Sequence, residues 1–289
     1  MIFESAKEWR NAPQKAVALI GMSGVGKTRI SAMLRDEGDW FHYSVDYRIG
    51  TRYLDEEIRD DFKREAMKNP YLRELLRSDS IYIGSNLSFH NLTPLSTWLG
   101  KPGDPDKGGI PFAEYLRRQS LHREAETRSM LDAAVFIERA RELYRYDNFV
   151  CDTSGSLCEV VEPDNQNDIV LNALYQAMLP VYIRGTEAHE ADLKARFDRA
   201  PKPMYYQEAF LKSVWRDYVE ETGGAEELVD PDAFIRYGFA RLLDHRRPRY
   251  QAIADKWGVV VEADEIAAVR DVADFESLIA DAVAKRAKR

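Results

Sequence analysis

The chain has 289 residues, of which 45% are hydrophobic and 31% charged, a composition typical of a globular protein. No apolar run reaches about 18 residues, which excludes a membrane-spanning helix, and the N-terminus lacks the apolar core of an export signal, so a cytoplasmic location is expected. The formal net charge of −8 argues against non-specific binding to nucleic acid or an anionic membrane. Cys151 and Cys158 match no metal-binding spacing and are expected to be free thiols.

The first predicted strand is Ala16–Ile20, a short apolar run. The residues after it fit the Walker A pattern G-x-x-x-x-G-K-[ST] of phosphate-binding loops (P-loops), and they read Gly21-Met22-Ser23-Gly24-Val25-Gly26-Lys27-Thr28. In such a loop the backbone N–H groups surround the phosphates, Lys27 reaches the β- and γ-phosphate oxygens, and the Thr28 hydroxyl binds Mg²⁺. Helical spacing after the loop places the phosphates at a helix N-terminus. The predicted nucleotide-binding residues here are Gly21, Ser23, Gly24, Val25, Gly26, Lys27 and Thr28.

Strand-like runs alternate with helical stretches along the rest of the chain. Further strands are expected at Phe41–Val45, Phe149–Cys151, Val181–Arg184 and Val259–Val261. This order predicts an α/β fold, a three-layer sandwich in which helices flank a five-stranded parallel sheet. The long stretch between the second and third strands predicts a helical insertion at residues 53–146, with a core at 1–52 and 147–289. Within the insertion, helices are expected near Asp55–Met67 and from about Phe112 to Tyr144.

Ligands of an open parallel sheet bind outside the carboxyl ends of its strands. Asp46 follows the second strand and is placed to deprotonate an acceptor hydroxyl. Two residues later, the forked cation of Arg48 suits a phosphate or carboxylate on the acceptor. Asp152 follows the third strand, where P-loop proteins keep the acid that binds or orients Mg²⁺. The alternatives are a helix cap for Asp46, a surface ion pair for Arg48 and an Asx-turn for Asp152.

The segment 195–204, which follows the fourth predicted strand, contains several cations. Arg196 and Arg199 are expected to close over the nucleotide and to neutralise charge on the transferred group, although a solvated helix end is the alternative. In the insertion, the polar stretch 85–91 contains Asn86 and His90, which could bind a polyhydroxylated acceptor or simply form a turn. Further along, the side chains Arg117, Arg118, His122 and Arg123 lie on one predicted helix, where helical spacing could gather some of them but a solvated face is favoured.

Together these residues resemble P-loop kinases of the polynucleotide kinase, zeta-toxin and shikimate kinase type. Asp46-Tyr47-Arg48 is similar to the element after strand two of phage-type polynucleotide kinases, in which the Asp is the base and the Arg contacts the acceptor's phosphate. Asp152-Thr153 resembles the acid and hydroxyl that end strand three in the same enzymes, which adds Thr153 to the acceptor site. The segment 192–199 resembles their arginine-bearing lid.

The segment 246–255 is similar to the R-x-P-x-Y-x-x-x-A-D stretch that precedes the last strand of shikimate kinases. That likeness implies that Asp264, in the loop after the last strand, borders the adenine. The resemblance covers about two thirds of the chain. The insertion departs from it because it is much longer than the acceptor region of shikimate kinases, and the 3′-phosphatase domain of the phage-type repair enzyme is not seen.

The sequence therefore predicts an ATP-binding, magnesium-dependent kinase, a transferase that moves the γ-phosphate to a hydroxyl of a small molecule. One alternative is a kinase that acts on nucleic-acid ends or modified bases, which the acidic charge does not favour. Another is a nucleotide-driven switch ATPase whose insertion binds a protein partner. The absence of a guanine-reading N-K-x-D element favours ATP over GTP. The acceptor and the oligomeric state are not specified.

Overall fold

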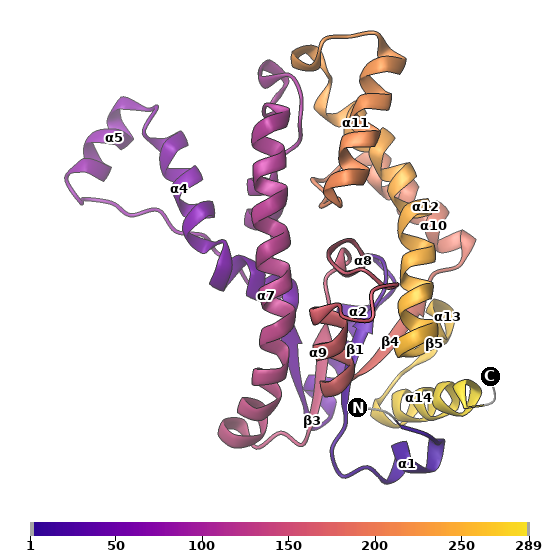
Figure 1. The fold of residues 1–289 in the computed structure, drawn as a ribbon. Coiled ribbons are helices and arrows are strands. Elements are labelled where there is room, and N and C mark those ends of the chain that lie inside the picture. Colours follow the sequence, from indigo (N-terminus) through magenta and orange to yellow (C-terminus); the bar gives the residue numbers. More distant parts are fainter. Residues whose placement is uncertain (1–2, 288–289) are drawn as a thin grey trace.

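The computed structural model describes residues 3–287 and contains one parallel sheet of five strands in the order β2-β3-β1-β4-β5 (Figure 1). The strands are β1 (Ala16–Ile20), β2 (Trp40–Ser44), β3 (Asn148–Asp152), β4 (Leu179–Arg184) and β5 (Val259–Glu262). The predicted α/β class and the five strands are confirmed. The predicted ends were partly wrong: the second strand stops at Ser44, because Ser44 accepts a hydrogen bond from the Tyr47 backbone N–H and caps a helix that starts at Val45.

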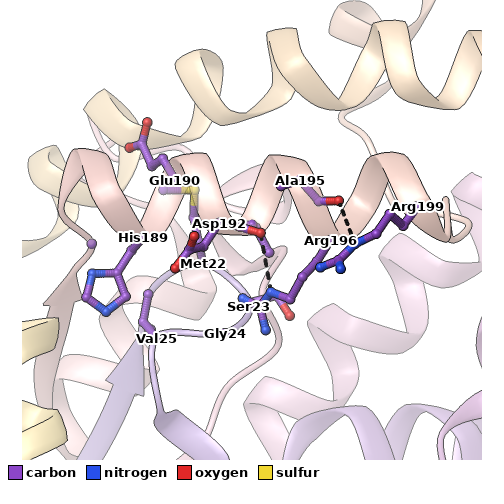
Figure 2. Close-up of a pocket in the computed structure, with 12 residues that line it drawn as sticks. Met22, Ser23, Gly24, Val25, His189, Glu190, Asp192, Ala195, Arg196 and Arg199 are labelled. Carbon is purple, nitrogen blue, oxygen red and sulfur yellow. Dashed lines mark hydrogen bonds between the residues drawn. The ribbon is translucent and has the colours of Figure 1, made fainter.

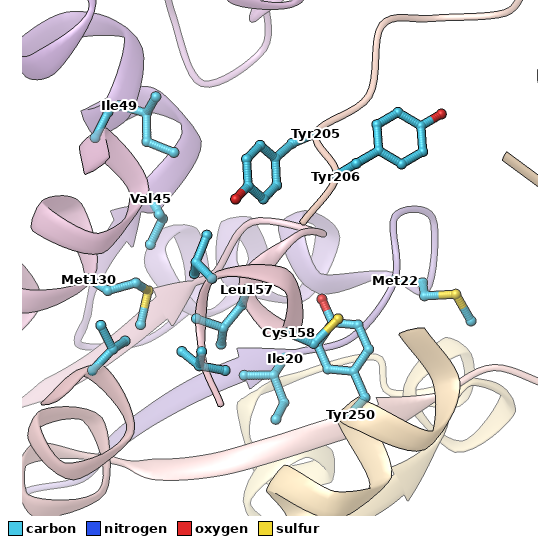
Figure 3. Packing of buried hydrophobic residues seen from close by; sticks show 14 of the residues in the cluster. Ile20, Met22, Val45, Ile49, Met130, Leu157, Cys158, Tyr205, Tyr206 and Tyr250 are labelled. Atoms are coloured by element: carbon cyan, nitrogen blue, oxygen red, sulfur yellow. The ribbon is translucent and has the colours of Figure 1, made fainter. Parts of the chain in front are cut away.

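Helices cover both faces of the sheet, and each face has its own apolar core. Along β1, Ala16, Ala18 and Ile20 pack on one side, while Val17 and Leu19 pack on the other. The second side is covered by α1 (Ala6–Asn11), α2 (Lys27–Glu37), α13 (Ala263–Ala268) and α14 (Val272–Arg286). The first side, seen from close by in Figure 3, is covered by α7 (Phe112–Tyr144), α8 (Leu157–Val160), α9 (Ile169–Ala177) and α12 (Pro231–Trp257).

The stretch between β2 and β3 is mostly helical, as predicted. It contains α3 (Val45–Arg48), the π-helical turn η1 (Ile49–Tyr53), α4 (Asp55–Ala66), α5 (Pro70–Arg77), α6 (Thr93–Leu99), the 3₁₀ turn η2 (Pro105–Lys107) and α7. Figure 1 shows α4 and α5 extending away from the sheet, and α5 has no buried residue. Residues 80–84, before the polar stretch 85–91, form neither helix nor strand, and Tyr82 is 93% exposed.

Three helices between β4 and β5 build a wall opposite α7. They are α10 (Glu187–Arg199), α11 (Glu208–Thr222) and α12, with the 3₁₀ turn η3 (Glu226–Leu228) between α11 and α12. Phe197 of α10 stacks on Phe239 of α12, with ring centroids 3.7 Å apart. Phe112 of α7 stacks on Trp215 of α11 at 4.4 Å, which joins this wall to the helices that follow β2. The carboxyl ends of β1 and β3 therefore open between two helical walls.

None of the described helices is both long and apolar enough to span a bilayer. Cys151 and Cys158 are buried free thiols, as expected.

Candidate nucleotide and phosphoryl-transfer site

The segment after β1 forms a turn that leads directly into α2. Gly21 has φ 141°, and a Cβ added there would lie 2.7 Å from the Ile183 carbonyl oxygen, so only glycine fits this position. Gly26, with φ 98°, is the N-cap of α2, which begins at Lys27. The backbone N–H groups of this turn and the start of α2 provide the anion-binding geometry of a phosphate loop.

The Lys27 side chain lies inside this turn. Its Nζ donates hydrogen bonds to the carbonyl oxygens of Gly21 at 2.7 Å and Met22 at 3.0 Å, and the residue is only 7% exposed. Burial lowers the pKa of Lys27, while the nearby carboxylates of Asp152 and Asp46 oppose that shift. The ammonium group is therefore enclosed by phosphate-loop carbonyls and faces two acids, the position from which it can reach a bound phosphate.

A cavity of about 230 Å³, called here the phosphate cavity, brings together the predicted catalytic residues Lys27 and Asp46 and the predicted metal ligands Thr28 and Asp152. It is lined by Ser23, Gly24, Gly26, Lys27, Thr28, Asp46, Asp152, Thr153 and Gly155. The residues come from the loop after β1 and the start of α2, from α3, and from the end of β3 and the loop after it, and they meet at the carboxyl end of the sheet.

Asp46 lies in the first turn of α3, between two cavities. It lines the phosphate cavity and also a neighbouring cavity of about 400 Å³, called here the side cavity. Burial, and to a smaller extent the negative charge of Asp152, raise the pKa of Asp46 to about 6 against the opposing effect of Lys27. A carboxylate with this pKa is ionised at neutral pH and is a better proton acceptor than an ordinary Asp.

The two predicted metal ligands, Thr28 and Asp152, offer oxygen atoms to the phosphate cavity. Thr28 is exposed to the phosphate cavity, and Asp152, 7% exposed, lines the same cavity. Within residues 3–287 no cluster of three or more His, Cys, Asp or Glu side chains could hold a metal ion. One hydroxyl and one carboxylate fit the way Mg²⁺ is bound in P-loop proteins, where phosphate oxygens and waters complete the octahedron.

A third cavity, of about 460 Å³, lies between the phosphate loop and α10 and is called here the lid cavity. Figure 2 shows Arg196 beside Ser23 and Gly24, with Arg199 one helical turn further on. A Cβ added at Gly24 would lie 3.0 Å from Nη2 of Arg196. Neither arginine is paired with a carboxylate in the part of the chain that the structure describes. Both predicted lid cations therefore reach the space next to the phosphate loop with their charge uncompensated.

Three other predicted site residues lie elsewhere or are already engaged. Arg48 forms two hydrogen bonds to Oδ2 of Asp132, at 2.9 and 2.7 Å, and lies over the Phe136 ring, so it does not line the three cavities. Thr153 lines the phosphate cavity, but its hydroxyl donates to the Leu19 carbonyl at 2.8 Å. Asp264 lies near His189, at 3.8 Å, and does not line the lid cavity.

The two acceptor candidates of the polar stretch 85–91 separate in the structure. His90 lines the side cavity, whereas Asn86 does not. The backbone carbonyl of Asn86 accepts a hydrogen bond from the Asn91 side chain at 3.0 Å. The role of each as a substrate ligand stays a prediction.

The expectation of a solvated helix face was correct for Arg117 and Arg123, which are exposed, and wrong for Arg118 and His122. Arg118 is 8% exposed and donates to the Trp98 carbonyl, while His122 is 6% exposed and stacks on Tyr205, with centroids 4.9 Å apart. These two side chains are buried because α6 and the segment 202–206 pack on this side of α7.

Sequence reasoning also missed a buried polar group behind the side cavity. Glu126 of α7 is fully buried and accepts hydrogen bonds from the hydroxyls of Ser154 and Ser156. Its position did carry a signal, because His122 and Glu126 precede the buried Met130 at intervals of four residues and so lie on the same face of this helix. Burial raises the pKa of Glu126 to about 7 and lowers the pKa of His122 to about 4.

The parallel sheet and the loop after β1 together define a P-loop α/β protein. No family model matches the chain, and no curated protein matches it. Among solved structures, the chain is similar to the shikimate kinase from Bacteroides thetaiotaomicron, at 13% identity over 92% of this chain and 94% of that one, with a TM-score of 0.39. Because a likeness of this strength says nothing of activity, function is inferred below from the site itself.

Proposed function

We propose that this protein is an ATP- and Mg²⁺-dependent phosphotransferase that moves the γ-phosphate of ATP to a hydroxyl of a small-molecule acceptor. The observation that carries the proposal is the position of Asp46, which lines both the cavity of the phosphate loop and the side cavity next to it. A switch protein or simple ATPase needs no proton acceptor facing a second cavity, whereas a kinase needs one there.

Each residue then has a separate task. The phosphate-loop amides and Lys27 hold the phosphates of ATP, and Thr28 and Asp152 would hold Mg²⁺, which neutralises charge on the phosphate oxygens when it is bound. Asp46 accepts the proton of the acceptor hydroxyl while the hydroxyl oxygen forms a bond to the γ-phosphorus. The bond between the γ-phosphorus and the bridging oxygen of the β-phosphate breaks, and ADP leaves. Arg196 and Arg199 stabilise the charge on the transferring group from the lid side.

The pH dependence follows from Asp46, which must be ionised to act. Because its pKa is raised to about 6, kcat/KM for ATP, measured at saturating magnesium, should increase with pH through about 6 and then level off. The residual activity of the Asp46→Asn variant should not show this increase near pH 6. The comparison of the two profiles distinguishes the ionisation of Asp46 from the ionisation of ATP. A profile that is flat from about pH 5 to 7 would contradict the assignment.

The direct test of the function is transfer. The purified protein, incubated with γ-labelled ATP, magnesium and a small-molecule extract, should pass the label to an organic hydroxyl, detected by mass spectrometry. Label only on inorganic phosphate would indicate an ATPase or a switch instead. Label on added oligonucleotides, decreasing steeply with salt, would indicate a nucleic-acid kinase.

A further inference from the structure

The side cavity has an apolar wall. Leu92, Leu95 and Leu99, in and next to α6, line it together with Met204 and Tyr205 from the segment before α11. Figure 3 shows Tyr205 and its neighbour Tyr206 leaving this segment in opposite directions. Such a wall suits an aromatic ring or a hydrocarbon part of a ligand.

The arginine side chains near this cavity are already hydrogen-bonded to protein groups. Arg246 is 3% exposed and donates to the carbonyls of Gly155 at 2.8 Å and Tyr205 at 2.7 Å, while its Nε faces Glu159 at 3.3 Å. All three sides of its guanidinium group are therefore engaged by the protein. Arg48, the residue expected to hold an acceptor's phosphate, is engaged by Asp132. Of the Lys and Arg side chains that line the cavity within residues 3–287, Lys202 alone is unpaired, and it is exposed.

The polar part of the cavity wall consists of a hydroxyl and an imidazole, with a buried glutamate behind them. Ser156 and His122 both line it, and Glu126 lies behind them. The Ser156 hydroxyl donates to Oε2 of Glu126 at 2.7 Å, and Nδ1 of His122 is 3.6 Å from the same oxygen. A serine hydroxyl that donates to a carboxylate keeps its lone pairs, which can accept a hydrogen bond from a ligand hydroxyl. Among the described residues that line the side cavity, Asp46 is the one carboxylate, and the one unpaired cation, Lys202, is exposed to solvent.

We propose that the phosphoryl acceptor is an uncharged compound with a hydroxylated end and an apolar or aromatic part. This inference rests on the proposed kinase function and names the substrate class of that site. A phosphate or carboxylate on the acceptor would be desolvated beside Asp46 without a buried free cation, which is unfavourable, whereas hydroxyls find acceptors in Ser156 and His122. The hydroxylated end lies at Ser156, and the apolar part lies against α6 and Tyr205.

The labelled product from the transfer assay tests this directly. We expect it to carry the new phosphate and no other phosphate or carboxylate. A product with a second phosphate or a carboxylate would overturn the inference and leave the kinase function intact. Failure to label any organic product would overturn the kinase function itself, and with it the inference.

A variant of the polar end gives a second, independent readout. The acceptor identified in the transfer assay is used as the substrate. Ser156→Ala should raise its KM about tenfold, because one buried hydrogen bond is lost, while the KM for ATP changes less than about twofold. Ser80→Ala, a change at an exposed serine that follows the C-terminal end of α5, is the matched control. An unchanged acceptor KM in a folded Ser156→Ala protein would show that the hydroxylated end does not bind there.

Discussion

Asp46→Asn is expected to lower the rate of phosphoryl transfer by about 10³-fold, equal to about 4 kcal/mol of transition-state stabilisation. Asparagine keeps the size of the side chain in α3 but cannot accept the proton of the acceptor hydroxyl. Binding of ATP and magnesium should change by less than about threefold, because the phosphate loop and Lys27 are untouched. Transfer is measured with γ-labelled ATP, and binding by calorimetry.

The stability of the Asn variant separates a catalytic role from a structural one. An acid whose pKa is raised in the folded state destabilises the fold once the pH exceeds its unfolded pKa of about 4, and the loss is complete above about 6. At neutral pH, Asp46→Asn should therefore unfold at the same temperature as the parent or higher, while Asp164→Asn, at an exposed position, provides the reference. Full turnover in the Asn variant would mean that another group is the base.

The positions of Asp46 and Asp152 could be predicted from sequence because they depend on local patterns. Each follows a short apolar run, and parallel strands bring their carboxyl ends to one edge of a sheet. The glycines of the phosphate loop are equally local, since Gly21 adopts a backbone angle that other residues rarely tolerate. Fold class and the phosphate cavity therefore follow from short segments of the chain.

The position of Arg48 depended on a detail that the sequence left open. The segment after β2 is one helical turn and not an extended loop, so residues two apart point about 200° from each other. With Asp46 on the cavity side, Arg48 faces α7 and meets Asp132. An extended chain would have placed both side chains on one face.

The polar group behind the side cavity needed the tertiary structure. Glu126 bonds to serines 28 and 30 residues away, and no local pattern links a helix position to a loop after a later strand. Arg246 likewise reaches a carbonyl 91 residues away. Charged residues on long helices are usually solvated, so the four-residue spacing alone does not predict this burial, which follows from the packing of α8 against α7 and α12.

Lys27→Ala is expected to reduce transfer by about 10³-fold or more and to weaken ATP binding as well, which distinguishes it from the Asp46 variant. The ammonium group is the buried cation of the phosphate cavity and is held by the carbonyls of Gly21 and Met22, so removing it leaves the charge on the transferring phosphate without its nearest partner. Calorimetry and the transfer assay measure the two effects separately.

Two comparisons make this result specific to the ammonium group. Lys27→Met keeps most of the side chain's apolar stem and should lose as much activity as the Ala variant, because the charge and not the stem interacts with phosphate. Lys7→Ala, at an exposed lysine of α1, should retain full activity. The Ala variant should remain folded, since burial already lowers the pKa of Lys27 and the folded state therefore gains little from that charge. If a folded Lys27→Ala protein bound ATP and transferred phosphate at the parent rate, the turn after β1 would not be the phosphate site, and the kinase function would have to be abandoned.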